Sequence, residues 1–216
     1  MSTALIVFAK APETSKRRLT AGVGRAAATR TAAALLDDAL ARGTASGLAP
    51  LYLYWNGPAS DLHLDKARAM NYRVEAQQGC DLGARMQDAF AQVLVECERA
   101  LLIGTDCPDL DAVWLADAGE RLHSNDVLFA PAKDGGYVAI GLGRTALPHL
   151  EMLFTGLDWG EDNVAAQTRK RIASAGLKVC ELAPLDDLDD AADLARLAER
   201  HPFLAATLQG AKISKI

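Results

Sequence analysis

A cluster of cations follows the first apolar run of the chain. Residues 3 to 9 are apolar, and the next ten residues contain Lys10, Lys16, Arg17 and Arg18. Lysine and arginine donate charge-assisted hydrogen bonds to phosphate oxygens, and arginine can do so with two nitrogens at once. Taken alone, the cations fit equally well a solvated surface run. They are therefore a candidate phosphate site that depends on its surroundings.

Two carboxylates follow another apolar run. Residues 100 to 103 are apolar, and Asp106 and Asp109 come directly after them. A hard divalent cation that bridges to phosphate oxygens is one way to stabilise acids at the end of a buried strand. Asp106 is the better candidate ligand, because Asp109 follows Pro108 and is expected to cap the next helix. The four histidines lack zinc-site spacing, so oxygen ligands favour Mg²⁺ or Mn²⁺.

Two glycine-flanked turns carry further polar candidates. Asp81 precedes a strongly apolar helical pattern and is expected to cap that helix, while Arg85 faces either ligand or solvent. Asp134 stands before Gly135 and Gly136. It either accepts hydrogen bonds from a sugar or forms an Asx turn.

The acidic run at residues 186 to 190 is ambiguous. It is either a solvated run that starts a helix or the source of a second metal ligand. The two common glycine-rich phosphate signatures are not found. A dinucleotide-binding fingerprint directly follows a strand, whereas Gly22-Val23-Gly24 lies about a dozen residues beyond the expected strand. No P-loop pattern occurs in the sequence.

The elements that must position these residues alternate along the chain. Short apolar runs predict buried strands, and the intervening segments have helical spacing, most clearly from Met86 to Cys97. This alternation predicts an α/β fold with a mostly parallel sheet. Without a repeat or linker, residues 1 to 216 are expected to form one domain. The strands are expected near residues 3–9, 51–55, 72–75, 100–104, 126–130, 137–140 and 177–182, and the helices near 25–42, 61–70, 84–97, 112–122, 163–175 and 191–199.

Composition excludes several classes of function. The 216 residues carry a net charge of −5, which argues against a nonspecific nucleic-acid binder. No apolar run approaches the roughly 20 residues of a membrane helix, and no signal peptide is recognised. The four cysteines lack C-x-x-C spacing, so free thiols in a cytoplasmic protein are expected.

The ordered motifs resemble a known family over residues 3 to 200. They are Lys10-Ala11-Pro12 with its basic loop, the 78–86 segment, the 104–110 segment, Asp134-Gly135-Gly136-Tyr137 and Asp187-Leu188-Asp189. In this order they resemble bacterial nucleotide-diphospho-sugar transferase-like proteins of the GT-A type, including the arsenosugar-biosynthesis glycosyltransferases, and look related to phospholactate guanylyltransferase.

The resemblance implies a Rossmann-like, three-layer α/β/α fold that binds a nucleotide above the sheet. It also implies roles for particular residues. The implied catalytic residues are Asp106 and Asp134; the nucleotide and phosphate contacts are Lys10, Ala11, Pro12, Lys16, Arg18, Asp81 and Arg85; the substrate contacts are Gly135, Gly136, Tyr137 and Trp159; the metal ligands are Asp106 and Asp189.

The expected activity is a Mg²⁺- or Mn²⁺-dependent glycosyl transfer from a nucleotide-diphospho-sugar to a small-molecule acceptor. A nucleotidyltransferase acting on a nucleoside triphosphate and a small phosphorylated acceptor is the alternative. A nucleotide-binding protein with weak or no turnover is the third hypothesis. It is suggested by Ser15 and Arg17 in the first loop and by Gly160-Glu161 after Trp159, where the family usually has other residues.

Overall fold

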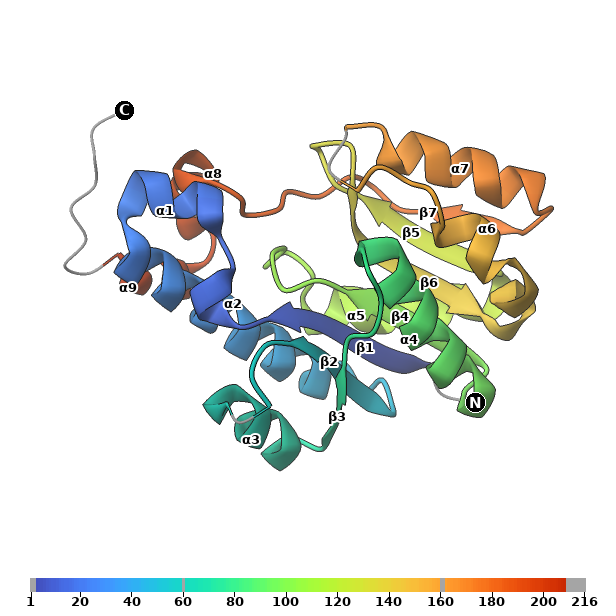
Figure 1. Ribbon diagram of the computed structural model, residues 1–216, viewed down its shortest axis with the longest axis horizontal. Coiled ribbons are helices and arrows are strands. Elements are labelled where there is room, and N and C mark those ends of the chain that lie inside the picture. The colour runs from blue at the N-terminus through green and yellow to red at the C-terminus, as the bar shows by residue number, and fades with distance from the viewer. Residues whose placement is uncertain (1–2, 60, 160–161, 209–216) are drawn as a thin grey trace.

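A seven-stranded sheet runs through the computed structural model, which describes residues 3–59, 61–159 and 162–208 (Figure 1). The strand order is β3-β2-β1-β4-β6-β5-β7, and β6 alone runs antiparallel to its neighbours. The mostly parallel α/β fold expected from the sequence is thereby confirmed. The strands are β1 (Ala4–Lys10), β2 (Leu51–Asn56), β3 (Tyr72–Ala76), β4 (Arg99–Ile103), β5 (Val127–Pro131), β6 (Tyr137–Gly143) and β7 (Val179–Glu181).

Helices cover both faces of the sheet, which gives three layers. Apolar residues of α4, α6 and α7 pack on one face, and those of α2, α3 and α5 pack on the other. The helices are α1 (Arg17–Val23), α2 (Arg25–Ala45), α3 (Leu62–Ala69), α4 (Leu82–Glu96), α5 (Ala112–Arg121), α6 (Leu150–Phe154), α7 (Val164–Ser174), α8 (Ala191–Ala198) and α9 (Pro202–Thr207), with 3-10 turns η1 (Pro12–Thr14), η2 (Leu122–Ser124) and η3 (Arg144–His149).

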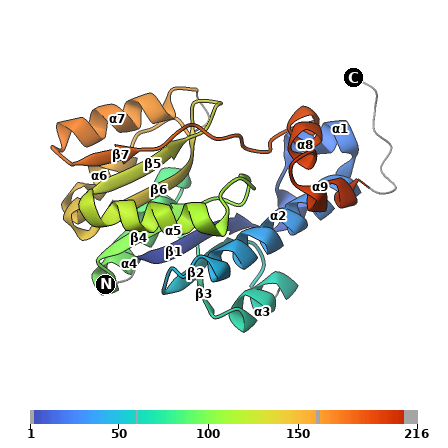
Figure 2. The same cartoon turned by 180° about the vertical axis from the view of Figure 1, so that it is seen from behind.

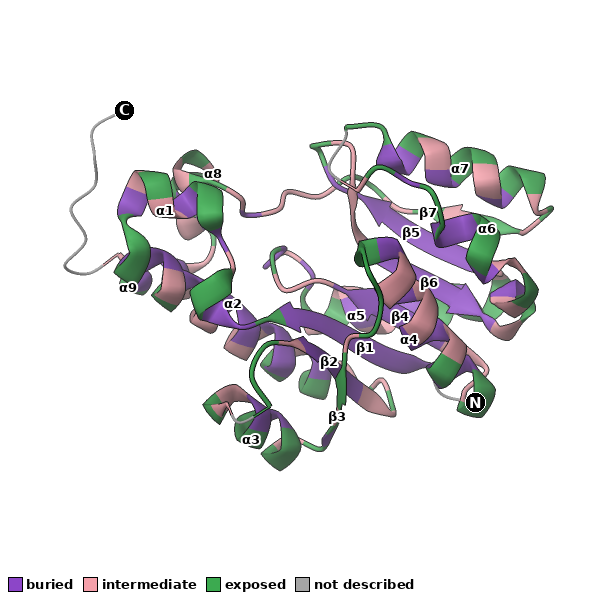
Figure 3. Cartoon of the chain, viewed as in Figure 1, coloured by how far each residue is buried: buried purple, intermediate pink, exposed green. Residues whose placement is uncertain are grey.

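Strand β1 shows why the central strands are apolar at every position. Ile6 and Phe8 contribute to the core beneath α4, whereas Leu5 and Val7 contribute to the core beneath α2 and α5. Alternate side chains of a strand point to opposite faces, so a strand covered on both faces must be apolar throughout. The buried central strands between partly exposed helices are visible in Figure 3.

Helix caps agree with the sequence at one position and differ at another. The Asp81 carboxylate accepts a hydrogen bond from the Ala84 amide at 2.8 Å, as predicted for the start of α4. The expectation that Asp109 caps α5 is wrong. Asp111 does so instead, by accepting a hydrogen bond from the Trp114 amide at 2.7 Å. Capping needs an acceptor two or three residues before the amide, and Asp109 lies too far from the first turn.

Helix α1 was not expected, since the basic segment was interpreted as an irregular loop. It forms because Leu19 and Val23 join a third apolar cluster with residues of α2, α8 and α9, including Leu194 and Leu204. Figures 1 and 2 show α1, α8 and α9 gathered at the end of the molecule opposite α7. The segment between β7 and α8 therefore runs from the β7 edge of the sheet back to α1, as Figure 1 shows.

The structure also describes the cysteines and the length and polarity of the helices. All four cysteines are free thiols. In the described ranges, the structure contains no helix with the length and apolar character needed to span a membrane.

Gly22 tests how closely α1 and α8 pack. A Cβ atom at residue 22 would lie 2.5 Å from Cβ of Ala191, closer than van der Waals contact permits. Gly22→Ala is therefore expected to lower the free energy of unfolding by about 1–3 kcal/mol through overpacking. Replacement of glycine by alanine within a helix otherwise stabilises it, so the sign is diagnostic. The measurement is urea unfolding, with exposed Ala21→Ser as the matched control. An unchanged or stabilised Gly22→Ala protein would contradict the close packing.

Candidate active site

The loops that carry the candidate residues meet at one edge of the sheet. Strands β1, β4 and β5 are oriented in the same direction, so the loops after them emerge together at their carboxyl ends. The segment that leads to α8 runs along this edge. Its Leu185 amide donates to the Pro131 carbonyl at 3.0 Å, and its Leu188 amide donates to the Asp106 carbonyl at 2.9 Å. Ligands of open α/β sheets bind at this edge.

Lys16 and Asp106 form the central contact. The Lys16 Nζ lies 2.9 Å from Asp106 Oδ1 and also donates to the Leu188 carbonyl. The Lys16 side chain is 3% exposed, whereas that of Asp106 is 51% exposed. Residue 16 adopts a left-handed conformation with φ 56°, which is unfavourable for a non-glycine residue. The chain therefore places a buried ammonium group against a carboxylate that faces solvent.

The second pair joins Arg18 to Asp189. Arg18 Nη1 lies 2.6 Å from Asp189 Oδ2, and both side chains are largely exposed. An exposed pair of this kind contributes little stability and can open readily. The two residues assigned by resemblance to metal binding, Asp106 and Asp189, are thus each paired with a basic residue of the first loop.

Asp187 is an acidic residue whose importance the sequence did not show. Burial, and then the charges of Asp134, Asp106 and Asp189, raise the pKa of the half-buried Asp187 to about 6. The four carboxylates therefore gather in one region. Asp187 could not be distinguished from its neighbours in the acidic run, because its burial depends on the path of the segment across the sheet edge.

Asp134 makes the Asx turn that was one of its two interpretations. Its Oδ1 accepts a hydrogen bond from the Gly136 amide at 2.9 Å, and the side chain is exposed. Gly135 has φ 94°, and a Cβ atom there would lie 1.9 Å from the Asp162 carbonyl oxygen, so only glycine fits. The Gly135 carbonyl accepts the Ala165 amide at 2.8 Å, which joins this turn to α7.

Tyr137, three residues after Asp134, packs against Trp159, and we call this pair the aromatic wall. Their rings are 6.0 Å apart and meet edge to face, and the Tyr137 hydroxyl donates to Met86 Sδ at 3.9 Å. Burial raises the pKa of the Tyr137 hydroxyl. The indole approaches so near that a Cβ atom at Gly83 would lie 2.5 Å from Trp159 Nε1. Gly160 and Glu161, which follow the indole, lie outside the described residues.

The remaining first-loop residues do not join the acidic region in the same way. Lys10 is exposed at the end of β1, and the Ala11 amide is already used by the Asn56 carbonyl at 3.0 Å. Pro12 has no amide hydrogen. Ala11 and Pro12 are both buried, so they shape the loop without offering backbone donors to a phosphate.

Arg85 makes no ion pair or hydrogen bond with an acidic side chain among the described residues. Its Nε donates to the Gly79 carbonyl at 3.1 Å, which holds the turn before α4 in the same way as the Asp81 cap. Arg85 is therefore bound locally, and its remaining nitrogens are the part of the side chain that a ligand could use.

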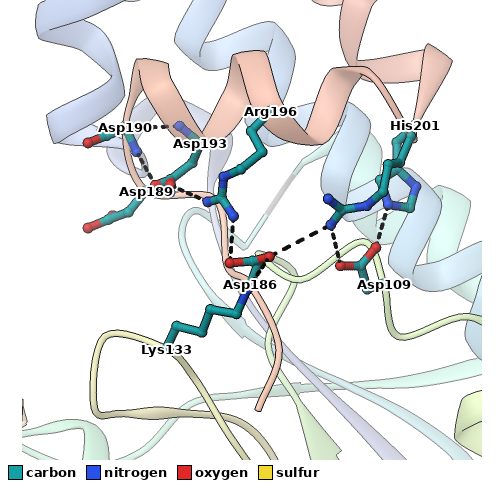
Figure 4. A network of polar contacts seen from close by, with 9 residues as sticks. Asp109, Lys133, Asp186, Asp189, Asp190, Asp193, Arg196 and His201 are labelled. Atoms are coloured by element: carbon teal, nitrogen blue, oxygen red, sulfur yellow. Dashed lines mark hydrogen bonds and ion pairs between the residues drawn. The ribbon is translucent and has the colours of Figure 1, made fainter. Parts of the chain in front are cut away.

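Ion pairs bind the α8–α9 region to the loops at the sheet edge (Figure 4). Asp186 lies 2.9 Å from Lys133 and 2.5 Å from Arg196. Asp109 lies 2.7 Å from both Arg200 and His201. Hydrogen bonds from these two partners lower the pKa of Asp109 although burial opposes that shift. The sequence missed the two pairs of Asp109, because residues 91 and 92 positions apart cannot be matched by spacing.

The carboxylate oxygens at this edge of the sheet are suited to Mg²⁺ or Mn²⁺. Among the described residues, no group of three or more histidine, cysteine or acidic side chains is close enough to hold a metal ion. Carboxylate oxygens are nevertheless the ligands that these cations prefer, and Mg²⁺ commonly uses one or two carboxylates together with substrate phosphates. The exposed Asp106 carboxylate beside other acids fits such an incomplete site.

Asp187 gives the site a measurable pH dependence. Its pKa is higher in the folded chain than the usual 3.8, so the folded state holds the proton more tightly. In metal-free buffer, this contribution to stability is present below pH 4 and is lost as pH rises through 6. At pH 7 the half-buried Asp187 carboxylate is charged, and this charge lowers the free energy of unfolding. Asparagine cannot ionise, so Asp187→Asn is expected to be more stable than wild type at pH 7.

The measurement is urea unfolding of both proteins from pH 2 to 7, a range that covers the pH windows of both Asp187 and the control. Asp126→Asn is the control of opposite sign, because hydrogen bonds from Thr145 and the Lys178 amide lower the pKa of Asp126. That contribution is present at neutral pH and is lost on acidification. Parallel stability curves for wild type and Asp187→Asn would contradict the assigned environment of Asp187.

Comparison with solved structures identifies the fold. A provisionally assigned nucleotide-diphospho-sugar transferase from Desulfovibrio desulfuricans G20 superposes with a TM-score of 0.81 and 28% identity, covering 96% of this chain and 99% of the other. A cytidylyltransferase from Leptospira borgpetersenii has a TM-score of 0.59 and 14% identity over 100% of both chains. Rv0371c from Mycobacterium tuberculosis, in complex with manganese, has a TM-score of 0.54 and 22% identity over 92% and 99%.

The match to a protein family covers less of the chain than the structural superpositions do. No curated protein sequence matches the chain. Residues 39–161 match the model of the family described as "Uncharacterized protein conserved in bacteria (DUF2064)", which is more than half of the chain. With the three-layer fold, the resemblance drawn from the ordered motifs is confirmed, and the chain belongs to the DUF2064 family.

Proposed function

We propose that this chain is a glycosyltransferase that takes a nucleotide-diphospho-sugar as donor and depends on Mg²⁺ or Mn²⁺. The observation that carries the proposal is the buried Lys16 ammonium held 2.9 Å from the exposed Asp106 carboxylate at the carboxyl edge of the sheet. The similarity to the Desulfovibrio protein, at 28% identity over nearly the whole chain, supports a nucleotide-diphospho-sugar as the ligand.

The basic loop supplies the positive charge that the leaving group requires. In glycosyl transfer, the bond between the anomeric carbon and the β-phosphate oxygen breaks, and negative charge develops on the nucleoside diphosphate. Lys16 and Arg18, two residues apart in the chain, would neutralise that charge. The buried Lys16 ammonium is held in position and would need little reorganisation during the reaction.

The acidic residues would serve the metal and the acceptor. Asp106 would hold the cation together with donor phosphate oxygens, and Asp189 would join it on leaving Arg18, or Asp187 would do so from its half-buried position. When bound, a divalent cation supplies charge stabilisation to the diphosphate. Asp134 would accept the proton from the acceptor hydroxyl as its oxygen bonds to the anomeric carbon.

The aromatic wall would contact the sugar or the acceptor. Tyr137 and Trp159 would add apolar contacts near the Asp134 turn, and Gly136 would allow a ligand to approach the backbone there, whereas the corresponding space at Gly135 is taken by the Asp162 carbonyl. Arg85 and Asp81 would lie toward the nucleotide, and Lys10 would add a further exposed cation. A site made of these residues would bind a soluble nucleotide and a small-molecule acceptor, and we propose no role for nucleic acid.

Product analysis distinguishes this proposal from its closest alternative. Purified protein is incubated with Mn²⁺ and a panel of nucleotide-diphospho-sugars, and separately with nucleoside triphosphates and small phosphorylated acids. Release of nucleoside diphosphate supports glycosyl transfer. Release of pyrophosphate shows a nucleotidyltransferase, which would use the same cations and carboxylates. Tight nucleotide binding without either product identifies a binding protein.

Asp106→Asn is the decisive variant. At temperatures where the variant is still folded, it is expected to lower Mn²⁺-dependent turnover about 10²–10³-fold, because the cation loses its charged ligand. Calorimetry should show weaker binding of nucleotide with Mn²⁺ and little change without it. Asp117→Asn is the matched control, since Asp117 is similarly exposed and pairs with Arg121 on α5. The proposal fails if both variants bind and turn over as wild type does.

A further inference from the structure

The Arg42 guanidinium lies between α2 and the loop that joins β4 to α5. The side chain is only 11% exposed. Its Nη1 approaches three carbonyl oxygens of that loop, at 3.1 Å from Cys107, 3.3 Å from Pro108 and 2.5 Å from Leu110. One nitrogen of a helix residue thus lies where three peptide dipoles of a single turn converge.

Burial of the charged Arg42 side chain has a cost in free energy. We therefore expect its hydrogen-bond donors to matter more to this loop than the volume of the side chain. Arg42 Nε lies 2.8 Å from Asp38 Oδ2, one turn earlier in α2. Burial raises the pKa of Asp38, so its environment disfavours the charged form. A partly buried ion pair is often no more stable than apolar residues of the same size. An apolar residue at position 42, however, would leave the converging carbonyl groups without a donor.

The loop that Arg42 holds is the loop that carries Asp106. Asp106 immediately precedes Cys107, the first of the three carbonyl partners. On its other side, the loop is held by Arg200 and His201 through Asp109. The position of Asp106 relative to the Lys16 ammonium is therefore fixed from α2 on one side and from the α8–α9 region on the other.

We propose that Arg42 is a positioning residue that places Asp106 for cation and phosphate binding. The inference rests on the proposed function, because it takes Asp106 to be the residue that binds the cation and the phosphate. Removal of the guanidinium lets the 106–110 turn relax and moves the Asp106 carboxylate away from Lys16. Displacements of about 1 Å at a reacting centre can cost about 10²-fold in rate.

Arg42→Met tests the proposal, and Arg144→Met is the matched control. Arg144 also donates to helix carbonyls, those of Leu94 and Val95, and pairs with Glu98. It follows β6, the antiparallel strand, and so lies at the opposite edge of the sheet from Asp106. Thermal unfolding establishes the temperature at which each variant is fully folded, and all measurements are made below it.

The first readout is independent of ligand. Cys107 is buried within the held turn, and Cys80 is exposed, so reaction with a thiol reagent reports on the loop and carries its own reference. Labelling of Cys107, followed by mass spectrometry, is expected to accelerate at least about tenfold in Arg42→Met, while Cys80 is unchanged. Arg144→Met should leave both rates as in wild type. An unchanged Cys107 rate in folded Arg42→Met overturns the proposal.

The second readout is a double-mutant cycle on the binding of Mn²⁺ with UDP or GDP, measured by calorimetry. Because Arg42 acts through Asp106, the Arg42→Met and Asp106→Asn double variant should bind no more weakly than Asp106→Asn alone. Arg42→Lys keeps a cation and should recover part of the affinity. Additive losses, or an unchanged affinity in Arg42→Met, contradict the positioning role. If wild type binds no nucleoside diphosphate, whatever its base, the proposed function fails, and Cys107 labelling still decides the loop geometry.

Discussion

The ion pair between Lys16 and Asp106 joins three distant parts of the chain. Lys16 comes from the first loop, Asp106 follows the central strand β4, and the Leu188 carbonyl that completes the contact belongs to the segment leading to α8. Each part needs the other two. Without Asp106 the ammonium would be buried with one neutral partner, and a buried charge in that state is strongly destabilising.

The rest of the fold brings these parts together. The parallel order of β1 and β4 places the first loop beside Asp106, and the third apolar cluster draws α8 and α9 onto α1. Ion pairs of Asp186 and Asp109 then fasten the connecting segment to the neighbouring loops. The apolar clusters supply most of the stability, whereas the charged contacts determine which loops face one another.

Most of the sheet could be predicted from the sequence, because strands buried on both faces leave apolar runs that are hard to mistake. The cap at Asp81 and the turn at Asp134 also follow from local rules. Helix α1 could not be predicted, since Leu19 and Val23 become apolar-face residues only when α8 packs against them. The role of Asp109 was misjudged for the same reason, as its partners Arg200 and His201 are remote in sequence.

The separations within the third apolar cluster bear on how the protein is made. Leu19 packs in a cluster with Leu204, and Lys16 contacts residue 188, so the early and late parts of the chain depend on each other. During synthesis the chain emerges from its N-terminus, and the central strands are complete before these partners exist. The cations of the basic loop therefore remain solvated until α8 and α9 have left the ribosome. The candidate active site is consequently assembled after the sheet that supports it.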